Sequence, residues 1–166
     1  MADVQGAQVY RYLSLPPGSE ANTLARKMID DHRGCINLNG TTVIHGEAFR
    51  GSLANATLRR RPALLDAVAA RPTSEPRRVP KGLGEIAFMG AFATCLVDAE
   101  PAKAVAVIRT TEMSEEERTA IMALGEGMKG CIASDTAYHL NYGDLRTFLA
   151  TAIFNSAVGG ALGNRS

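Results

Sequence analysis

The sequence predicts a mainly α-helical fold made of two copies of one unit. Tryptophan is absent and aromatic residues make up 5% of the chain, while alanine is abundant, a composition that favours helices over a β-sandwich. Residues 20–58 also align with residues 116–154 without a gap, at a constant offset of 96. The identical pairs are Glu20/Glu116, Thr23/Thr119, Gly34/Gly130, Cys35/Cys131, Ile36/Ile132, Arg50/Arg146, Leu53/Leu149, Ala54/Ala150 and Ala56/Ala152. A self-match of this length predicts a tandem duplication.

The bulk composition predicts one compact domain. With 166 residues, the chain can form one medium domain or two small halves around a shared core. Hydrophobic residues make up 46% and charged residues 21%, which is typical of a globular protein. A formal net charge of +1 gives no overall attraction to nucleic acid or to an anionic membrane. No segment is long and apolar enough to span a bilayer. A protein partner or self-association is the expected interaction, because the positions shared by the two copies are mostly apolar, small or capping residues.

The first repeat, residues 1–61, is predicted to be a helix–helix–strand–helix unit. Its segments are a helix over Val4–Leu13, a helix over Glu20–Arg33, a strand over Thr42–His45 and a helix over Glu47–Arg59. Ser19 is a favourable N-cap for the second helix and Gly34 is a favourable stop. The β-branched residues of the third segment favour a strand. In the last helix the apolar pattern places Phe49, Leu53 and Ala56 on the inward face.

A basic, proline-rich linker, residues 62–83, is predicted to join the two repeats. It holds four of the seven prolines. Ala63–Ala70 is predicted to form a short helix within it, and Arg71–Lys81 to form the linker proper.

The second repeat, residues 84–158, is predicted to follow the same order after one additional helix. Its segments are helices over Gly84–Val97, Ala102–Arg109 and Ser114–Lys129, a strand over Tyr138–Asn141 and a helix over Asp144–Ala157. Ser114 and Glu117 are spaced as a capping box, and Gly130 is the expected stop of that helix. The inward residues of the last helix are predicted to be Leu145, Leu149, Ala152 and Ile153. The tail, residues 159–166, is expected to be flexible.

The two repeats are expected to pack about a pseudo-twofold axis, because neither alone buries enough apolar surface. The two strands would lie near this axis and pair as a minimal two-stranded β-ribbon covered by helices. Arg50 and Arg146 occupy equivalent positions near the start of the last helix of each repeat. Two interpretations remain open for them. Their stems cover the edge of the core, or each guanidinium binds the loop carbonyls after its own Gly-Cys-Ile.

Two patterns resemble ligand sites but lack the features that such sites need. Gly125–Gly130 spells G-x-G-x-x-G, yet it follows a predicted helix instead of a strand, so the helix end beside it is the wrong one for an anion. His32, Cys35 and His45 offer three ligands for zinc, which needs a fourth. Neither histidine is repeated in the second copy. The sequence therefore predicts no cofactor and no metal ion, and it leaves any catalytic residue unknown.

The segment Arg59–Lys81 is the most basic part of the chain. Its positive residues are Arg59, Arg60, Arg61, Arg71, Arg77, Arg78 and Lys81, against Asp66 and Glu75. Such a local excess can contact phosphates. No aromatic residue lies among these charges and no nucleic-acid recognition motif accompanies them, so a solvated linker is the preferred interpretation.

Several short patterns together resemble a family of small uncharacterised bacterial proteins. They are Phe92–Val97, Ala104-Val105, Ser114–Glu116, Gly130–Ile132 and Leu145–Ala152 in the second half, and Leu13 to Leu58 in the first. The family is α-helical and usually exported, with a tandem helical repeat and no known activity. The resemblance implies export and a Cys95–Cys131 disulfide. The first-half equivalent of Cys95 would fall near or before residue 1, which leaves Cys35 without an obvious partner.

These observations predict a non-catalytic helical module of the bacterial envelope that binds another macromolecule or a second copy of itself. Two alternatives are a small enzyme with a site near His32, Asp31, Cys35 and His45, and a nucleic-acid-associated regulator that uses Arg59–Lys81. A periplasmic or secreted location is expected if Met1 is an added start before a mature chain, and a cytoplasmic one otherwise. The shared positions Cys35, Arg50 and Arg146 are predicted to be structural.

Overall fold

The computed structural model describes residues 2–15, 18–31, 46–133 and 141–163, and within these ranges its regular structure is all helical. The helices are α1 (Ala2–Ser14), α2 (Ser19–Asp31), α3 (Gly46–Arg60), α4 (Pro62–Ala69), α5 (Glu85–Ala99), α6 (Pro101–Arg109), α7 (Glu115–Met122), α8 (Gly125–Cys131) and α9 (Tyr142–Gly163). The predicted mainly α fold is therefore confirmed. None of the helices in the described ranges has the length and apolar character needed to cross a bilayer.

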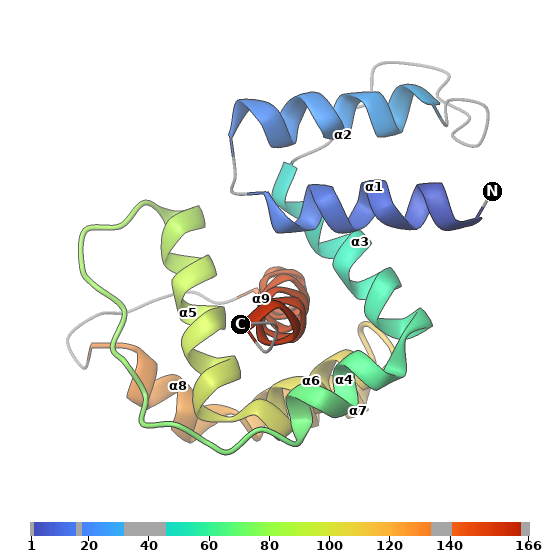
Figure 1. Cartoon of the computed structure of the whole chain (residues 1–166). Helices are drawn as coiled ribbons and strands as arrows, with labels where there is room; N and C mark the ends of the chain where they lie inside the picture. The colour runs from blue at the N-terminus through green and yellow to red at the C-terminus, as the bar shows by residue number, and fades with distance from the viewer. Residues whose placement is uncertain (1, 16–17, 32–45, 134–140, 164–166) are drawn as a thin grey trace.

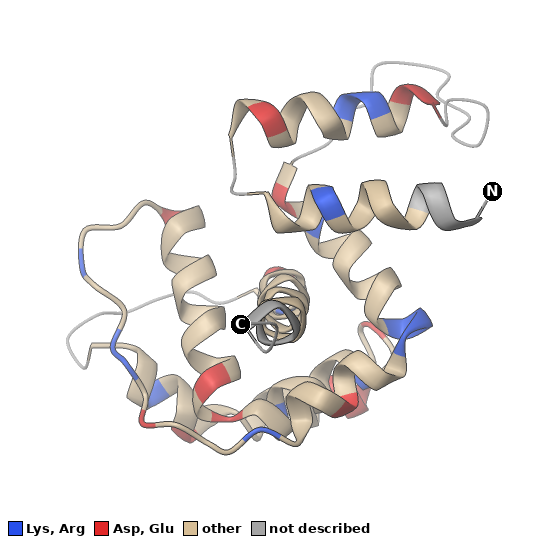
Figure 2. Ribbon diagram, in the orientation of Figure 1, with Lys and Arg blue, Asp and Glu red and all other residues tan. Residues whose placement is uncertain are grey.

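The last helix, α9, lies at the centre of the molecule. Figure 1 looks along its axis and shows α1, α3, α5 and the α4–α6 pair arranged around it. Its fully buried side chains include Leu145, Leu149, Ile153 and Phe154, as the apolar pattern predicted for the first three. The charged residues of α9 are Asp144 and Arg146, both near its start (Figure 2). A helix that is apolar around most of its circumference is a core helix, and the others pack around it.

The helices α3 and α9 cross at very close range. A Cβ atom added to Gly51 of α3 would lie 2.2 Å from Thr147 Cγ2 and 2.8 Å from the Thr147 carbonyl oxygen. Only a residue without a side chain lets the two backbones approach this closely. Residues 51 and 147 differ by the 96-residue offset of the sequence repeat.

The residues that α3 buries are not the ones that the sequence predicted. Its buried residues are Arg50, Gly51, Ala54 and Leu58, whereas Ala56 is exposed and Phe49 and Leu53 are only partly buried. The apolar pattern misplaced this face because it counted only apolar side chains, whereas Arg50 and Gly51 lie on the buried face.

The predicted helix over Ser114–Lys129 is two helices in the structure. The chain turns at Ala123–Leu124, between α7 and α8, where the Leu124 amide bonds the carbonyl of Ile121 in a tighter turn. Both Ile121 and Leu124 are buried, and the turn lets each of them reach the core. The helix α8 also continues through Gly130 to Cys131, so Gly130 is not the stop.

Packing explains two glycines of the G-x-G-x-x-G pattern in α8. A Cβ atom on Gly127 would lie 2.9 Å from Glu100 Cγ, and one on Gly130 would lie 2.7 Å from Pro76 Cγ. Gly130 thereby lets the segment 71–81 run against α8, where the Val79 amide donates to the Cys131 carbonyl at 2.9 Å. The segment 71–81, predicted to be a solvated linker, is therefore held against α8 at Pro76 and Val79.

Two further expectations differ from the structure or lie outside it. The helix α9 extends through Gly163, into the segment that was expected to be a flexible tail. The predicted strand Thr42–His45 lies outside the described residues, and so does most of Tyr138–Asn141. Asn141, the one described residue of the two segments, is neither helical nor extended in a strand.

Candidate functional site

The side chain of Arg50 binds the end of α1. Its Nη1 donates to the carbonyl oxygens of Leu13 at 3.0 Å and Leu15 at 2.9 Å, one residue before and one residue after the last residue of α1. The guanidinium also lies over the Tyr12 ring, 4.8 Å from its centroid. Burial raises the pKa of Tyr12 above its usual value, although the nearby Arg50 charge opposes this. Carbonyls at a helix end lack intrahelical partners, and Arg50 supplies them.

Arg146 does the same at the end of α6. Its Nη2 donates to the carbonyl oxygens of Ile108 at 3.1 Å and Thr110 at 3.0 Å, which again flank the last helical residue. Its Nη1 donates to the Val107 carbonyl and, at 2.7 Å, to Glu117 Oε1. Both arginines are 4% exposed. Their hydrogen bonds go to the end of an earlier helix, α1 for Arg50 and α6 for Arg146, so the interpretation as stems that only cover the core edge is wrong. These carbonyls come before each Gly-Cys-Ile and differ from those of the other interpretation, whose loops lie mostly outside the described residues.

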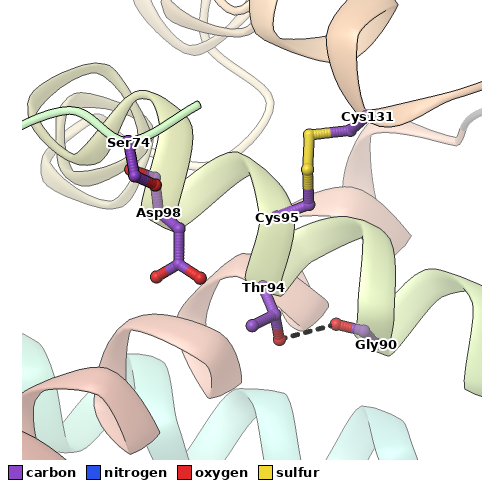
Figure 3. The surroundings of a disulfide bond; sticks show 6 residues. All are labelled: Ser74, Gly90, Thr94, Cys95, Asp98 and Cys131. Carbon is purple, nitrogen blue, oxygen red and sulfur yellow. Dashed lines mark hydrogen bonds between the residues drawn. A yellow bond between two sulfur atoms is a disulfide. The ribbon is translucent and has the colours of Figure 1, made fainter. Parts of the chain in front are cut away.

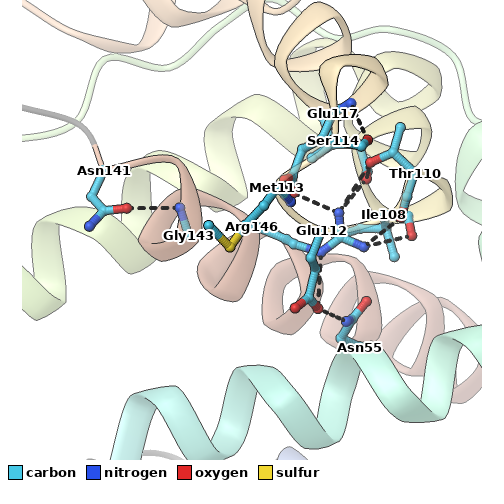
Figure 4. Close-up of polar contacts among 11 residues, drawn as sticks. Asn55, Ile108, Thr110, Glu112, Met113, Ser114, Glu117, Asn141, Gly143 and Arg146 are labelled. Atoms are coloured by element: carbon cyan, nitrogen blue, oxygen red, sulfur yellow. Dashed lines mark hydrogen bonds and ion pairs between the residues drawn. The ribbon is translucent and has the colours of Figure 1, made fainter.

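Glu117 connects Arg146 to the start of α7. Its second carboxylate oxygen accepts from the Met113 amide at 2.6 Å, while the Glu117 amide donates to the Ser114 hydroxyl at 3.1 Å. The predicted capping box is therefore present in a shifted form, because the carboxylate reaches the amide before the N-cap residue. Both oxygens of Glu117 have partners, and the residue is buried within this network (Figure 4).

A hollow of about 640 Å³ opens beside this network. We call it the Arg146 hollow. Its walls come from α3 (Gly51, Ser52, Asn55), from residues 112–118 at the start of α7 and from residues 141–147 at the start of α9. The floor is polar. Asn55 Nδ2 donates to Glu112 Oε1 at 2.8 Å, and the same oxygen lies 3.5 Å from Arg146 Nε.

Two buried polar atoms in the Arg146 hollow lack a hydrogen-bond partner among the described residues. They are Asn55 Oδ1, an acceptor, and Arg146 Nε, a donor. Most buried polar atoms in folded proteins are hydrogen-bonded. Both atoms have almost no accessible surface, so a ligand could bond them only after a side chain beside them, such as Glu112, moves away.

Two apolar side chains stand at the rim of the Arg146 hollow. Met113 is 98% exposed and has a backbone φ of 60°, while Tyr142 is 47% exposed. A left-handed backbone is unfavourable for a residue with a side chain, and Met113 is the only described non-glycine residue that adopts it. Sequence reasoning missed this rim, because no pattern in the chain signals the conformation of a single loop residue.

A second hollow of about 890 Å³ lies on the other side of the α3–α9 crossing, beside Arg50. We call it the Arg50 hollow. Its α9 wall includes Phe148 and Thr151, which are 96 positions after Ser52 and Asn55 of the Arg146 hollow. The first turns of α5 close its other side, with Ile86 58% exposed there.

The predicted disulfide is present between Cys95 of α5 and Cys131 of α8 (Figure 3). Their Cα atoms are 6.0 Å apart and the bond spans 36 positions. Both cysteines are buried, Cys131 fully. Ser74 binds the Asp98 carbonyl on the same helix, so the disulfide and the segment 71–81 hold α5 and α8 together.

The other predicted site residues are not brought into a described site. His32, Cys35 and His45 lie outside the described residues, and neighbouring Asp31 is exposed at the end of α2. No cluster of metal-binding side chains occurs in the described ranges. Within the basic segment, Arg71 donates to Ser156 of α9 and Arg61 lies over the Tyr10 ring. Arg61 and Arg71 of this segment therefore interact with other parts of the protein.

Comparisons with protein-family models, curated proteins and solved structures found no match to the chain.

Proposed function

We propose that this chain is a non-catalytic binding module that recognises a protein partner or a second copy of itself through the Arg146 hollow. We further propose that the module arose by tandem duplication and works in the bacterial envelope. The observation that carries the binding role is the rim residue Met113, which is almost fully exposed and held in an unfavourable backbone conformation beside open polar atoms.

Three relationships support a duplication about a pseudo-twofold axis at the α3–α9 crossing. Gly51 touches its sequence equivalent Thr147. Arg50 and Arg146 bind the carbonyls that flank the last residue of α1 and of α6, respectively. The Arg146 hollow is lined by Ser52 and Asn55 of α3, and the Arg50 hollow is lined by the residues 96 positions later in α9. In this arrangement the axis passes near Gly51 and exchanges one hollow for the other.

The use of the polar groups favours binding over catalysis. Both oxygens of Glu117 are engaged, by Arg146 and by the Met113 amide, so neither is free to transfer a proton. Arg146 is committed to the end of α6 through its terminal nitrogens. These groups shape the floor of the Arg146 hollow and keep the loop that carries Met113 in place.

Met113 supports a role in binding because it is unfavourable for the fold alone. A glycine at this position would relieve a backbone cost of about 1 kcal/mol. The methionine side chain makes up for none of this through burial, since it is 98% exposed. Methionine is well suited to adaptable binding surfaces because its chain is flexible and polarisable.

The envelope location rests on the disulfide and on the family resemblance. Disulfides persist in oxidising compartments and are rare where thiols are kept reduced. A protein that keeps Cys95 and Cys131 joined fits the periplasm or the extracellular space.

The proposal can be tested by site-specific photo-crosslinking in the native host. A photoreactive amino acid replaces Tyr142 at the rim, and a second variant carries it at Lys27, which is exposed on α2 and does not line the Arg146 hollow. We expect a defined crosslinked protein from position 142 and none from position 27. Equal products from both positions, or no product from position 142, would overturn the proposal.

A further inference from the structure

We infer that the Arg146 hollow binds a carboxylate with a neighbouring N–H group, which is the chemistry of a peptide C-terminus, in the place that Glu112 now fills. The inference rests on the proposed function, because it names the ligand of the same hollow.

The carboxylate of Glu112 marks the position of the ligand group. Its Oε1 accepts from Asn55 Nδ2 at 2.8 Å and lies 3.5 Å from Arg146 Nε. The Glu112 side chain is 60% exposed, whereas that of Arg146 is 5% exposed. A solvent-exposed partner in such a pair contributes little to stability and can leave at low cost. Glu112 thus acts as an internal stand-in for an external carboxylate.

The two open atoms define what the ligand adds. Arg146 Nε is a buried donor without a hydrogen bond, and Asn55 Oδ1 is a buried acceptor without one. A ligand carboxylate placed more deeply than the Glu112 carboxylate supplies an acceptor to Nε, with charge assistance. A ligand N–H supplies the donor that Asn55 Oδ1 lacks.

The Asn55 amide group fits both parts of one peptide end. Its Nδ2–H faces the carboxylate position and its Oδ1 is adjacent on the same planar group. In a C-terminal residue the carboxylate and the amide N–H are attached to the same Cα atom. Asn55 can therefore donate to the carboxylate and accept from the N–H of a single residue.

The charges around the Arg146 hollow exclude two other ligand classes. Its acidic residues Glu112, Glu115 and Glu117 outnumber Arg118 and Arg146. A ligand carboxylate adds one negative charge while the exposed Glu112 carboxylate moves into solvent, where water screens it, whereas a phosphate dianion would add two negative charges beside Glu117. A metal or ammonium cation would be attracted by the surplus acid, but it cannot accept a hydrogen bond from Arg146 Nε. A monocarboxylate satisfies both conditions.

The rim defines the rest of the ligand. Met113 and Tyr142 are the exposed large apolar side chains among the lining residues. An apolar side chain on the C-terminal residue would lie between them while the carboxylate reaches the floor. The predicted ligand is consequently a peptide that ends in an apolar residue with a free carboxylate.

The test uses the full-length protein with its disulfide intact and a synthetic probe, acetyl-alanyl-leucine. The matched probe is the same dipeptide with a C-terminal carboxamide. Binding is followed by NMR through the Asn55 side-chain amide and the Arg146 Nε–H signals. We expect the free acid to shift both signals in a saturable way and the carboxamide to leave them unchanged.

Two variants separate displacement of Glu112 from a general charge effect. Glu112→Ala removes the internal competitor and should raise the affinity for the free acid several-fold. Glu115→Ala removes the same charge from the rim, where Glu115 pairs with Arg118, and should change the affinity much less. Asn55→Ala should lower the affinity by about tenfold or more, because it removes one donor and one acceptor.

Equal binding of acid and carboxamide, or equal gains from Glu112→Ala and Glu115→Ala, would overturn the inference. If Tyr142 still crosslinks a protein partner in that case, the proposed binding face stands and only its ligand chemistry is wrong. Absence of both the crosslink and the probe binding would contradict the proposed function as well.

Discussion

Gly51 of α3 lies directly against Thr147 of α9, and the two residues hold equivalent positions of the sequence repeat. The contact brings the central helix α9 against α3, the helix whose sequence it matches at the 96-residue offset. A side chain at residue 51 would have to occupy the space of the Thr147 backbone, which cannot move without separating the two helices.

Gly51→Ala is therefore expected to destabilise the protein by about 1–3 kcal/mol, through overpacking. The matched control is Gly90→Ala in α5, where an added Cβ atom meets nothing within 4 Å. That substitution should stabilise by about 0.5–1 kcal/mol, because alanine favours a helix over glycine. Chemical denaturation of both variants measures the difference, and similar effects of the two substitutions would contradict a tight crossing.

Arg146→Lys is expected to lower the free energy of unfolding by about 2–4 kcal/mol. Lysine keeps the charge beside Glu117 but loses the planar fork that binds the carbonyls at the end of α6. Arg50→Lys should also destabilise, by about 1–3 kcal/mol, because two carbonyls at the end of α1 lose their donor. The control is Arg109→Lys, which alters a half-exposed pair with Asp66 and should be nearly neutral. Melting temperatures that match for all three variants would refute the capping role.

The disulfide predicts a definite thiol count. Of the three cysteines, the denatured and non-reduced protein should show one free thiol, that of Cys35. Cys95→Ser with Cys131→Ser should lower stability by about 3–4 kcal/mol, because the bond closes a loop that spans 36 positions. Cys35→Ser in the wild-type protein, with the disulfide intact, serves as the control for loss of a cysteine outside that disulfide. Three free thiols in protein isolated from its native compartment would remove the main support for an envelope location.

Tyr12 predicts a loss of stability at alkaline pH. Burial raises its pKa in the folded protein above the usual value, so the unfolded chain ionises first as the pH rises. The contribution is fully present below pH about 10 and is lost as the pH rises through the folded pKa. Tyr12→Phe should flatten the decline of the melting temperature above pH about 10, whereas Tyr142→Phe at an exposed position should not. An unchanged decline in Tyr12→Phe would count against burial of the ionisable hydroxyl.

Most helices could be predicted from the sequence, because capping residues, prolines or glycines lie near their ends and apolar residues recur at helical spacing. Ser114, predicted as part of a capping box, is the N-cap of α7 in the structure. The cysteine pair followed from the family resemblance, since spacing alone does not select a partner for Cys131. The break between α7 and α8 was not predicted, because it depends on two buried residues that reach the core from different directions.

The candidate site was the part that the sequence predicted least. Arg50 and Arg146 stood out through the repeat, but their partners are carbonyl oxygens, which every residue has. Asn55 and Glu112 lie 57 positions apart and match no motif, and only the fold brings them together. Met113 is recognisable as a rim residue through its φ and exposure, and neither property is encoded in a local pattern.

One variant, Met113→Gly, tests most directly whether the Arg146 hollow is the binding face. Two measurements are made on it: the thermal unfolding of the purified protein, and crosslinking from position 142 in the native host. We predict a higher melting temperature, because glycine accepts the left-handed backbone, together with a clear loss of the crosslinked partner. A variant with the higher melting temperature that still captures the partner at the full yield would contradict the account, since the exposed methionine would then have no part in binding.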